Sequence, residues 1–331
     1  MNTPKGTSAL DAVSYHRTVK VLQDVAAAPV GPFDRAEWFA LLETAGHRPL
    51  IAVARQGENA IALPLSDANG RIEALRNWYT FSWRPVGMLD DHLIAVVARD
   101  LRTRAAGVTL WPIPDEDGAA SRLASGFRSA GWAVSCTPCD HNHVLEVAGR
   151  SFAEYWSGRP GQIRATHKRK ANRVSVDLFD RFDGSAWEAY QAIYGDSWKP
   201  AEGDPELLRQ FAQAEGAAGR IRLGVARAEG EPVAAQFWTV ENKIAYIHKL
   251  AHRESARHLS PGTILTAALF ERVIDTDRVD LVDFGTGNDP YKRDWMEHDR
   301  PRYRIDCLDP RQPRAWPALA KRALARFSSE G

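Results

Sequence analysis

The sequence has few cysteines, little net charge and no long hydrophobic segment, and each absence excludes a class of protein. Three cysteines among 331 residues are too few for a disulfide framework, which indicates a reducing compartment. Lysine plus arginine number 43 against 42 for aspartate plus glutamate, so no overall field attracts nucleic acid or a membrane. The opening residues MNTPKGTSAL lack the apolar core of a signal peptide, and no apolar run approaches the roughly 18 residues of a membrane helix. We therefore expect a cytoplasmic protein with no membrane span.

The sequence does contain enough apolar material for a substantial core, with 44% hydrophobic and 26% charged residues. A chain of this length predicts two domains. We place them at residues 1–150 and 151–310, followed by a basic amphipathic helix over residues 311–331 that caps a domain. Nothing in the sequence specifies an oligomeric state.

A cluster of thiols and imidazoles in the first half has the residue types of a metal site, because zinc selects both ligands. Its members are Cys136, Cys139, His141 and His143. Four ligands within these eight residues would strain a tetrahedral geometry, and residues 132–136 and 143–147 have the pattern of two short strands. We therefore expect strands here and no metal.

Apolar periodicity and turn residues predict the same order of elements in both halves. The first half has a loosely attached strand and a helix capped by Asp34, and then, in order, three strands, a helix, a strand, a helix and a strand, over residues 18–22, 34–43, 50–54, 60–65, 72–75, 92–105, 108–111, 119–130 and 132–136. The second half has a helix, three strands, a helix, a strand, a helical turn and a strand, over residues 187–198, 221–227, 232–240, 244–251, 260–273, 280–284, 291–295 and 303–308. This repeated order indicates an internal duplication within an α/β protein.

A glycine-containing loop, Asp283-Phe284-Gly285-Thr286-Gly287-Asn288, follows a hydrophobic strand and imitates the first motif of a methyltransferase. Such a motif opens a doubly wound sheet and needs several more strand and helix units after it. Fewer than fifty residues follow this loop, which excludes that interpretation.

A better candidate for phosphate binding is the helix start Ser260-Pro261-Gly262-Thr263-Ile264, which follows the strand at residues 244–251. A helix start presents backbone N–H groups and the positive end of a dipole to an anion. Proline has no N–H to leave unused at the first helical position, and Gly262 lets a ligand approach the backbone. Arg253 and Arg257, just upstream, have guanidinium groups that pair with phosphates.

Three segments together resemble the GNAT acyltransferase domain of CelD-like proteins, which are associated with cellulose and exopolysaccharide synthesis. They are Tyr246-Ile247-His248-Lys249-Leu250-Ala251, Ser260-Pro261-Gly262-Thr263-Ile264-Leu265 and residues 282–292. The resemblance covers residues 152–308 and, more faintly, 33–83, and the domain is related to Fem-type aminoacyltransferases. It implies tandem GNAT-like domains, the first degenerate, each with a mixed β-sheet flanked by helices.

The resemblance also implies an acyl-coenzyme A co-substrate that lies beside the strand at residues 244–251, with its pyrophosphate at Gly262, Thr263 and Ile264. An amine or hydroxyl must then lose a proton to a base, an oxyanion must be stabilised, and the departing thiolate must be protonated. Tyr291 is the candidate acid for the thiolate, and His248 and Asp283 are the candidate bases. Lys249 or Lys292 would orient a carboxylate on the acceptor or the donor.

Each of these residues also has a purely structural interpretation. His248 fits a hydrogen-bonded core histidine, and Asp283 fits a carboxylate that caps its own loop. Tyr291 beside Lys292 fits a packing aromatic next to a solvated charge. The helix start at Ser260 lacks the arginine-rich glycine signature of other GNAT enzymes, so coenzyme A follows from the resemblance alone.

A basic segment from Arg159 to Arg173 carries six lysines or arginines, one histidine and no acidic residue, and is predicted to be a helix. It resembles the basic helix that precedes the catalytic domain in the same family. Arg164 and Lys168, four residues apart, share one helix face and would hold an anionic acceptor or a phosphate. The acceptor arm of a tRNA would use the same charges.

The leading hypothesis is an acyl-CoA-dependent N- or O-acyltransferase that acts on a small molecule, a sugar or a cell-envelope precursor. Its first rival is a Fem-type transferase that uses aminoacyl-tRNA, which the net charge of +1 and the lack of heptads disfavour. The second rival is a catalytically inactive binding protein with the same fold. Pocket shape decides the acyl group and the acceptor, and no short motif records it.

Overall fold

The computed structural model describes residues 12–25, 28–68 and 71–329, and the chain divides into two compact units. The first contains the described residues up to Asp140 and from Pro301 onward, and the second is His141–Arg300. The expected boundaries at residues 150 and 310 differ from this division. The reason is strand β13 (His298–Leu308), which pairs antiparallel with β6 (Gly107–Ile113) of the first unit from Tyr303 onward.

The first unit is built on a mixed sheet whose strands follow the order β1-β2-β3-β4-β6-β13, with β5 paired to β3. The expected meander is present as β2, β3 and β4, and the expected helices are present as α1, α2 and α3. The strands other than β6 and β13 are β1 (Ser14–His16), β2 (Pro49–Gln56), β3 (Asn59–Ala68), β4 (Arg71–Ala74) and β5 (Val86–Gly87). The helices are α1 (Ala36–Thr44), α2 (Asp91–Leu101) and α3 (Ala119–Ser129).

Two local predictions in the first unit are wrong. The segment expected to form a strand at residues 18–22 is a 3₁₀ helix, Val19–Asp24, because the Thr18 hydroxyl caps it by accepting from the Lys20 N–H. Asp34 does not cap α1, since its carboxylate accepts instead from the N–H groups of Val30 and Gly31. In both places a short polar side chain finds a local backbone partner that periodicity alone does not reveal.

The two short strands expected at residues 132–136 and 143–147 are a single strand, β7 (Ala133–Glu146). Residues 137–142, which separate the two expected strands, do not turn the chain: Thr137 before Pro138 favours extended backbone, and pairing with the neighbouring strands of the sheet keeps the segment extended. Among the described residues, no group of three or more His, Cys, Asp or Glu side chains is arranged to hold a metal ion.

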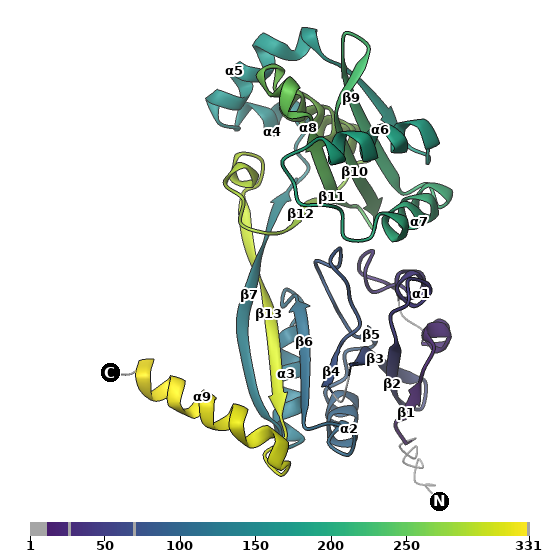
Figure 1. The fold of residues 1–331 in the computed structure, drawn as a ribbon, viewed down its shortest axis with the longest axis vertical. Helices are drawn as coiled ribbons and strands as arrows, with labels where there is room; N and C mark the ends of the chain where they lie inside the picture. Colours follow the sequence, from purple (N-terminus) through teal and green to yellow (C-terminus); the bar gives the residue numbers. More distant parts are fainter. Residues whose placement is uncertain (1–11, 26–27, 69–70, 330–331) are drawn as a thin grey trace, which may run out of the picture. The chain divides into compact units, whose positions relative to one another are not determined.

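The second unit is a mixed sheet with strand order β7-β12-β11-β10-β9-β8 (Figure 1). Its meander of β9, β10 and β11 confirms the sequence prediction, whereas β8, α4 and α7 were not predicted. The strands after β7 are β8 (Ser175–Phe179), β9 (Ile221–Ala228), β10 (Glu231–Glu241), β11 (Ile244–His252) and β12 (Leu281–Thr286). The helices are α4 (Phe152–Ser157), α5 (Gly161–Lys170), α6 (Gly184–Gly195), α7 (Pro205–Ala217) and α8 (Pro261–Glu271).

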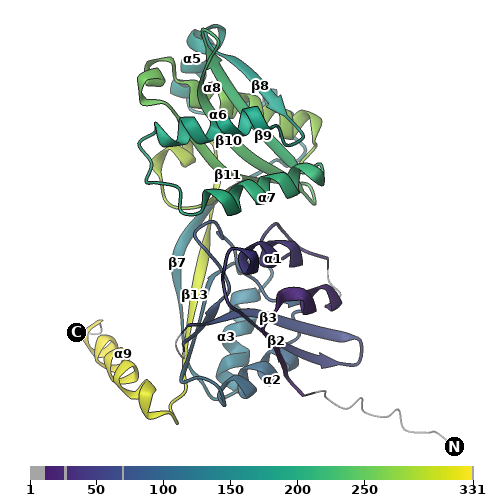
Figure 2. The same ribbon diagram turned by 45° about the vertical axis from the view of Figure 1, so that its right-hand side comes forward.

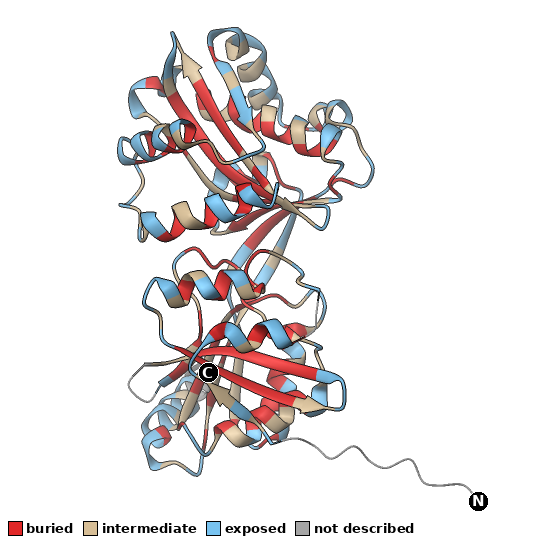
Figure 3. Ribbon diagram, turned by 90° about the vertical axis from the view of Figure 1, so that its right-hand side faces the viewer, coloured by how far each residue is buried: buried red, intermediate tan, exposed pale blue. Residues whose placement is uncertain are grey.

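Strand β10 is covered on both faces, as its alternating contacts demonstrate. The Phe237 ring packs on Trp187 of α6 and Phe211 of α7, with ring centroids 5.4 and 5.7 Å away. The next residue, Trp238, packs edge-on against Phe270 of α8 on the opposite face, because successive strand side chains alternate. Helices α6 and α7 therefore lie on one side of the sheet and α8 on the other (Figure 2). The strands between them are buried along most of their length (Figure 3).

Gly216→Ala is expected to lower the free energy of unfolding by about 1–3 kcal/mol, because the added methyl has no room. A Cβ at Gly216 in α7 would lie 2.6 Å from both the backbone nitrogen and the Cβ of Phe182. Gly184→Ala at the start of α6 is the matched control, since no atom lies within 4 Å of its added Cβ. Urea denaturation of both variants measures the difference. Equal stability of the two would mean that α7 and Phe182 do not pack this closely in solution.

The predicted C-terminal helix is present as α9 (Trp316–Ser329). The Arg322 guanidinium attaches it to the first unit by donating to the carbonyl oxygens of Ala133 and Asp306. None of the helices in the described ranges is both long and apolar enough to cross a membrane.

Candidate functional site

The sheet of the second unit opens between two of its strands. Strands β11 and β12 are parallel neighbours, but their register contains only the pairs Ile244 with Leu281, Ala245 with Val282, and Tyr246 with Asp283. Beyond this point β11 continues to His252 alongside β10, while β12 continues to Thr286 alongside β7. The edge of β11 that faces β12 is therefore left with backbone groups that an elongated ligand can pair with.

A β-bulge turns two of the predicted site residues toward the same face of the sheet. Lys249 pairs with Phe237 and Ile247 pairs with Trp238, so His248 is the extra residue on β11. Such a bulge changes the direction of neighbouring side chains. His248 and Lys249 consequently both contact groups on the α6 and α7 side of the sheet.

His248 is enclosed by aromatic rings. Its imidazole stacks on Phe237 and meets Phe211 edge-on, at centroid distances of 5.0 and 5.1 Å. Its Nε2 is hydrogen-bonded to the Thr239 hydroxyl at 2.8 Å. These contacts are the ones expected if His248 is a hydrogen-bonded histidine of the core.

The α8 helix begins next to the open end of β11. Ser260 adopts a left-handed backbone conformation with φ of 54°, and its carbonyl accepts from the N–H groups of Thr263 and Ile264 at 3.1 and 3.3 Å. A Cβ on Gly262 would lie 3.7 Å from Nδ1 of His252, so the last residue of β11 borders the helix start. The chain therefore passes from strand to helix as predicted, with Gly262 at the second helical position, but the N–H groups of Thr263 and Ile264 are already bonded to Ser260.

The basic side chain that reaches this helix start is one that the sequence did not single out. Lys170, at the end of α5, donates to the Ser260 hydroxyl at 2.9 Å and to the His258 carbonyl at 2.7 Å. Of the two predicted arginines, Arg253 is paired with Asp196 at 3.0 Å, and Arg257 is largely exposed and lies 3.8 Å from Glu254.

The helix α5 itself is exposed, with none of its residues buried. Arg164 and Lys168 project from it as predicted, although the Arg164 guanidinium also donates to the Arg159 carbonyl at 3.0 Å. Arg159 has a different role from the rest of the basic segment, because it is buried and forms an ion pair with Glu297.

The glycine loop after β12 is closed by Asp283 and Lys292. The buried Asp283 carboxylate accepts from the Asn142 amide at 2.8 Å and from the Gly285 N–H at 2.7 Å. The buried Lys292 ammonium donates to the Thr286 carbonyl at 2.5 Å. These contacts match the loop-capping interpretation of Asp283, and they give Lys292 a comparable role.

Tyr291 lies beside this loop with 37% of its surface exposed. Its ring meets Phe284 of β12 edge-on at 5.7 Å. Burial of the hydroxyl, together with the nearby Asp289, raises the pKa of Tyr291. The phenol therefore keeps its proton at neutral pH, as an acid for a departing thiolate requires.

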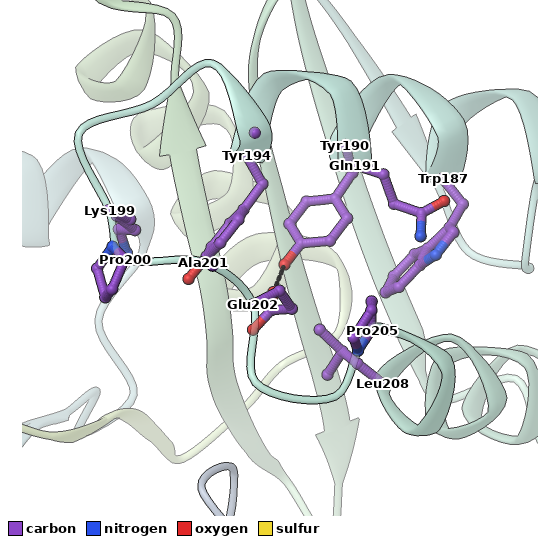
Figure 4. Close-up of a pocket in the computed structure, with 11 residues that line it drawn as sticks. Trp187, Tyr190, Gln191, Tyr194, Lys199, Pro200, Ala201, Glu202, Pro205 and Leu208 are labelled. Atoms are coloured by element: carbon purple, nitrogen blue, oxygen red, sulfur yellow. Dashed lines mark hydrogen bonds between the residues drawn. The ribbon is translucent and has the colours of Figure 1, made fainter.

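A cavity of about 350 Å³ lies between α6 and the segment that leads into α7. Figure 4 shows that aromatic rings from α6 and the Glu202 side chain point into it. The residues that line it are Trp187, Tyr190, Gln191, Tyr194, Gly195, Lys199, Pro200, Ala201, Glu202, Pro205 and Leu208.

The cavity is connected to β11 through Glu202. This carboxylate accepts from the Tyr190 hydroxyl at 2.8 Å and from the Lys249 ammonium at 2.6 Å. The pKa of Lys199 is lowered to about 8, first by burial and then by repulsion from Lys249, with a smaller contribution from Lys292. Of the predicted residues, Lys249 is thus the one that joins the cavity to the strand.

Glu202, Lys199 and Lys170 are site residues that the sequence analysis missed. Lys199 and Glu202 lie in the connection between two helices, where a lysine or glutamate ordinarily indicates solvated surface. A sequence feature that could have indicated Lys199 and Glu202 is the segment Trp198-Lys199-Pro200-Ala201-Glu202. In it, the two charged residues lie among an aromatic residue that packs and a proline that restricts the backbone.

Residues 161–293 match the sequence profile of the acetyltransferase (GNAT) domain. Solved structures of similar fold include FemX, with a TM-score of 0.62 and 10% identity over 82% of this chain and 91% of that one. They also include the C-terminal domain of a putative lysylphosphatidylglycerol synthetase from Agrobacterium fabrum, with a TM-score of 0.56 and 13% identity over 88% and 90%. L-PGS from Bacillus licheniformis gives 0.55 and 12% over 89% and 98%. No curated protein matches the sequence significantly. The predicted mixed α/β fold with tandem GNAT-like organisation is confirmed.

Proposed function

Because residues 161–293 form an acetyltransferase (GNAT) domain, we propose that the protein transfers an acyl group from an acyl-coenzyme A to an amine of a small molecule. The observation that carries the proposal is the separation of β11 from β12 after three residue pairs, beside the start of α8. An acyl-CoA has amide groups along its chain that can pair with the exposed strand edge. Its pyrophosphate suits the positive end of a helix.

We assign the cationic contact at the phosphate end to Lys170 and keep Gly262 as the point of close backbone approach. The Lys170 ammonium already lies within hydrogen-bond distance of Ser260, at the residue before the helix begins. We place Arg257 as a second positive charge at the rim, because its side chain is exposed, with Glu254 3.8 Å away offsetting part of that charge. Thr263 and Ile264 then shape the first turn of α8, with their N–H groups bonded to Ser260.

We assign the base to Glu202 in preference to His248 and Asp283. The Glu202 carboxylate faces the cavity, whereas the His248 imidazole is enclosed by Phe211 and Phe237. The Asp283 carboxylate is buried and bonded within its own loop, whereas Glu202, although bonded to Tyr190 and Lys249, lines the cavity. Tyr291 remains the proposed acid, because its phenol is protonated at neutral pH and lies beside the loop after β12 with part of its surface exposed.

The reaction that these residues serve is a simple substitution. The acceptor ammonium loses a first proton to solvent, and the resulting amine nitrogen forms a bond to the thioester carbonyl carbon as Glu202 takes its second proton. The carbon–sulfur bond breaks as the tetrahedral intermediate collapses, and the thiolate takes a proton from Tyr291. The products are an amide and a free thiol, and the proton taken by Glu202 balances the one given by Tyr291 when both side chains recover their starting state.

The decisive experiment is a thermal-shift panel of coenzyme A, acetyl-CoA and longer acyl-CoAs against charged and uncharged tRNA. Acetyl-CoA at 100 times its Kd is expected to stabilise the protein by about 2.7 kcal/mol, because it binds the native state alone. Thiol release in the presence of acceptor then separates an enzyme from an inactive binding protein. Stabilisation by charged tRNA and by no acyl-CoA would overturn the proposal, and the exposed basic helix α5 would then hold the nucleic acid.

Lys170→Met and Lys168→Met form a matched pair for the same panel. Both remove one positive charge from α5, but only Lys170 contacts Ser260 at the helix start. Lys170→Met is expected to raise the Kd for acetyl-CoA about tenfold, and Lys168→Met to change it little. An equal rise in the Kd for acetyl-CoA in both variants would show that the whole basic face of α5 attracts the ligand, as the sequence predicted for Arg164 and Lys168.

A further inference from the structure

The cavity beside α6 has walls that suit a flat or apolar body. The Trp187 and Tyr190 rings lie 4.8 Å apart between centroids, and Tyr194 follows at 5.9 Å from Tyr190. Pro200, Pro205 and Leu208 add further apolar surface. A volume of about 350 Å³ is near the lower limit of small-molecule sites, so the cavity suits a compound or side chain of amino-acid size.

The polar groups of the cavity are of opposite sign and have different partners. Glu202 is already bonded to Tyr190 and Lys249. By contrast, no carboxylate among the described residues lies within ion-pair distance of the Lys199 ammonium. This ammonium lies 5.8 Å from the centroid of the Trp198 ring. A ligand carboxylate would therefore pair with Lys199, and a ligand ammonium would share the Glu202 carboxylate with Tyr190 and Lys249.

We propose that this cavity binds the acyl acceptor as an amino acid with an aromatic or apolar side chain, its carboxylate on Lys199 and its amino group on Glu202. The side chain lies among Trp187, Tyr190 and Tyr194. This inference depends on the proposed function in one respect, that the bound amino acid is the acyl acceptor. The binding site is argued from the lining residues alone.

The charges around Lys199 favour an incoming anion. Three cationic or protonatable side chains act on its charge, those of Lys249, Lys292 and His252. The carboxylates of Glu202 and Asp289 partly offset them. Burial and Lys249 lower the pKa of Lys199 to about 8, so the amine is only part-protonated near that pH. A carboxylate beside it would favour the charged form and raise the pKa again. Binding near pH 8 should therefore be accompanied by proton uptake.

The test is isothermal titration calorimetry at pH 8 with four probes. L-phenylalanine carries both groups, 2-phenylethylamine lacks the carboxylate, 3-phenylpropionate lacks the amine, and glucosamine is a sugar amine. L-phenylalanine is expected to bind about tenfold more tightly than 2-phenylethylamine, because a hydrogen-bonded charge pair is lost in the latter. Repeating the titration in buffers of different ionisation enthalpy measures the proton uptake.

Three variants identify the group responsible. Lys199→Met should abolish both the preference for the carboxylate and the proton uptake, whereas Lys199→Arg should keep the preference. Lys243→Met, which removes an exposed lysine from the turn before β11, is the control and should behave as the unchanged protein. Equal binding of L-phenylalanine and 2-phenylethylamine, or a preference for glucosamine, would overturn the inference.

The outcomes also separate this inference from the proposed function. Binding of acetyl-CoA without binding of L-phenylalanine would refute the amino-acid site and leave the acyltransferase proposal standing. Binding of L-phenylalanine with proton uptake, but of no acyl-CoA, would establish the site and refute the acyltransferase.

Discussion

Glu202→Gln is expected to reduce the rate of acyl transfer by about 10²- to 10⁴-fold, the usual contribution of a general base. The glutamine keeps the size of the side chain, and its one carbonyl oxygen can still accept from Lys249 while its NH2 group donates to the Tyr190 hydroxyl oxygen. It cannot take a proton from the acceptor at neutral pH. The loss should therefore appear in turnover, with little change in the affinity for acetyl-CoA.

Thiol release measured as a function of pH tests this role. The rate of thiol release should be lower in Glu202→Gln than in the unchanged protein at every pH measured, while the Kd for acetyl-CoA stays the same. Glu188→Gln is the control, because Glu188 is an exposed residue of α6, the helix that supplies Trp187 and Tyr190 to the cavity. If Glu202→Gln turns over at the normal rate, the base is elsewhere, and His248 and Asp283 become the residues to substitute next.

Asp309→Asn is expected to lower the free energy of unfolding by about 3 kcal/mol, because it removes the buried counter-ion of the largely enclosed Arg102 guanidinium. Asp309 has no exposed surface, and its carboxylate lies 2.6 Å from the Arg102 guanidinium just after helix α2. Arg102 also donates to the Ala130 carbonyl at 2.7 Å, so it joins two parts of the first unit. Urea denaturation measures the loss.

The same pair predicts a pH dependence of stability. The hydrogen bond from Arg102 holds the pKa of Asp309 well below its usual range. A carboxylate with a lowered folded-state pKa stabilises the protein above its unfolded value of about 3.9, and this contribution is lost as the pH falls through the folded-state value. The stability difference between the unchanged protein and Asp309→Asn should thus be constant near pH 6 and shrink below about pH 4.

Asp91→Asn is the matched control, since its partner Arg122 lies at a comparable 2.6 Å but the Asp91 side chain is 72% exposed. Exposed ion pairs contribute at most about 1 kcal/mol. A loss at Asp309 no larger than the loss at Asp91 would mean that the buried pair is solvated in the protein.

In the second unit, local sequence patterns predict some elements and fail to predict others. The turns before β10 and β11, the helix start at Ser260 and the strand before Gly285 all follow from residues within a few positions of each other. The extended course of β7 depends instead on whether Thr137 and Pro138 turn or continue, and the residues that decide this are its partners in the sheet. The strand β8 was missed for a related reason, because it is short and largely exposed at the edge.

The sequence by itself determined the class of the fold, the order of the β9 to β11 meander and the strand-to-helix start at Gly262. Hydrophobic period, turn residues and helix caps act over a few residues, so one chain records them directly. Only the tertiary structure decided that β13 joins β6, that Lys170 reaches Ser260 and that Glu202 meets Lys249. Glu202 and Lys249 lie 47 residues apart in the chain, and no local pattern encodes a contact that the packing of α6 and the β11 bulge brings about.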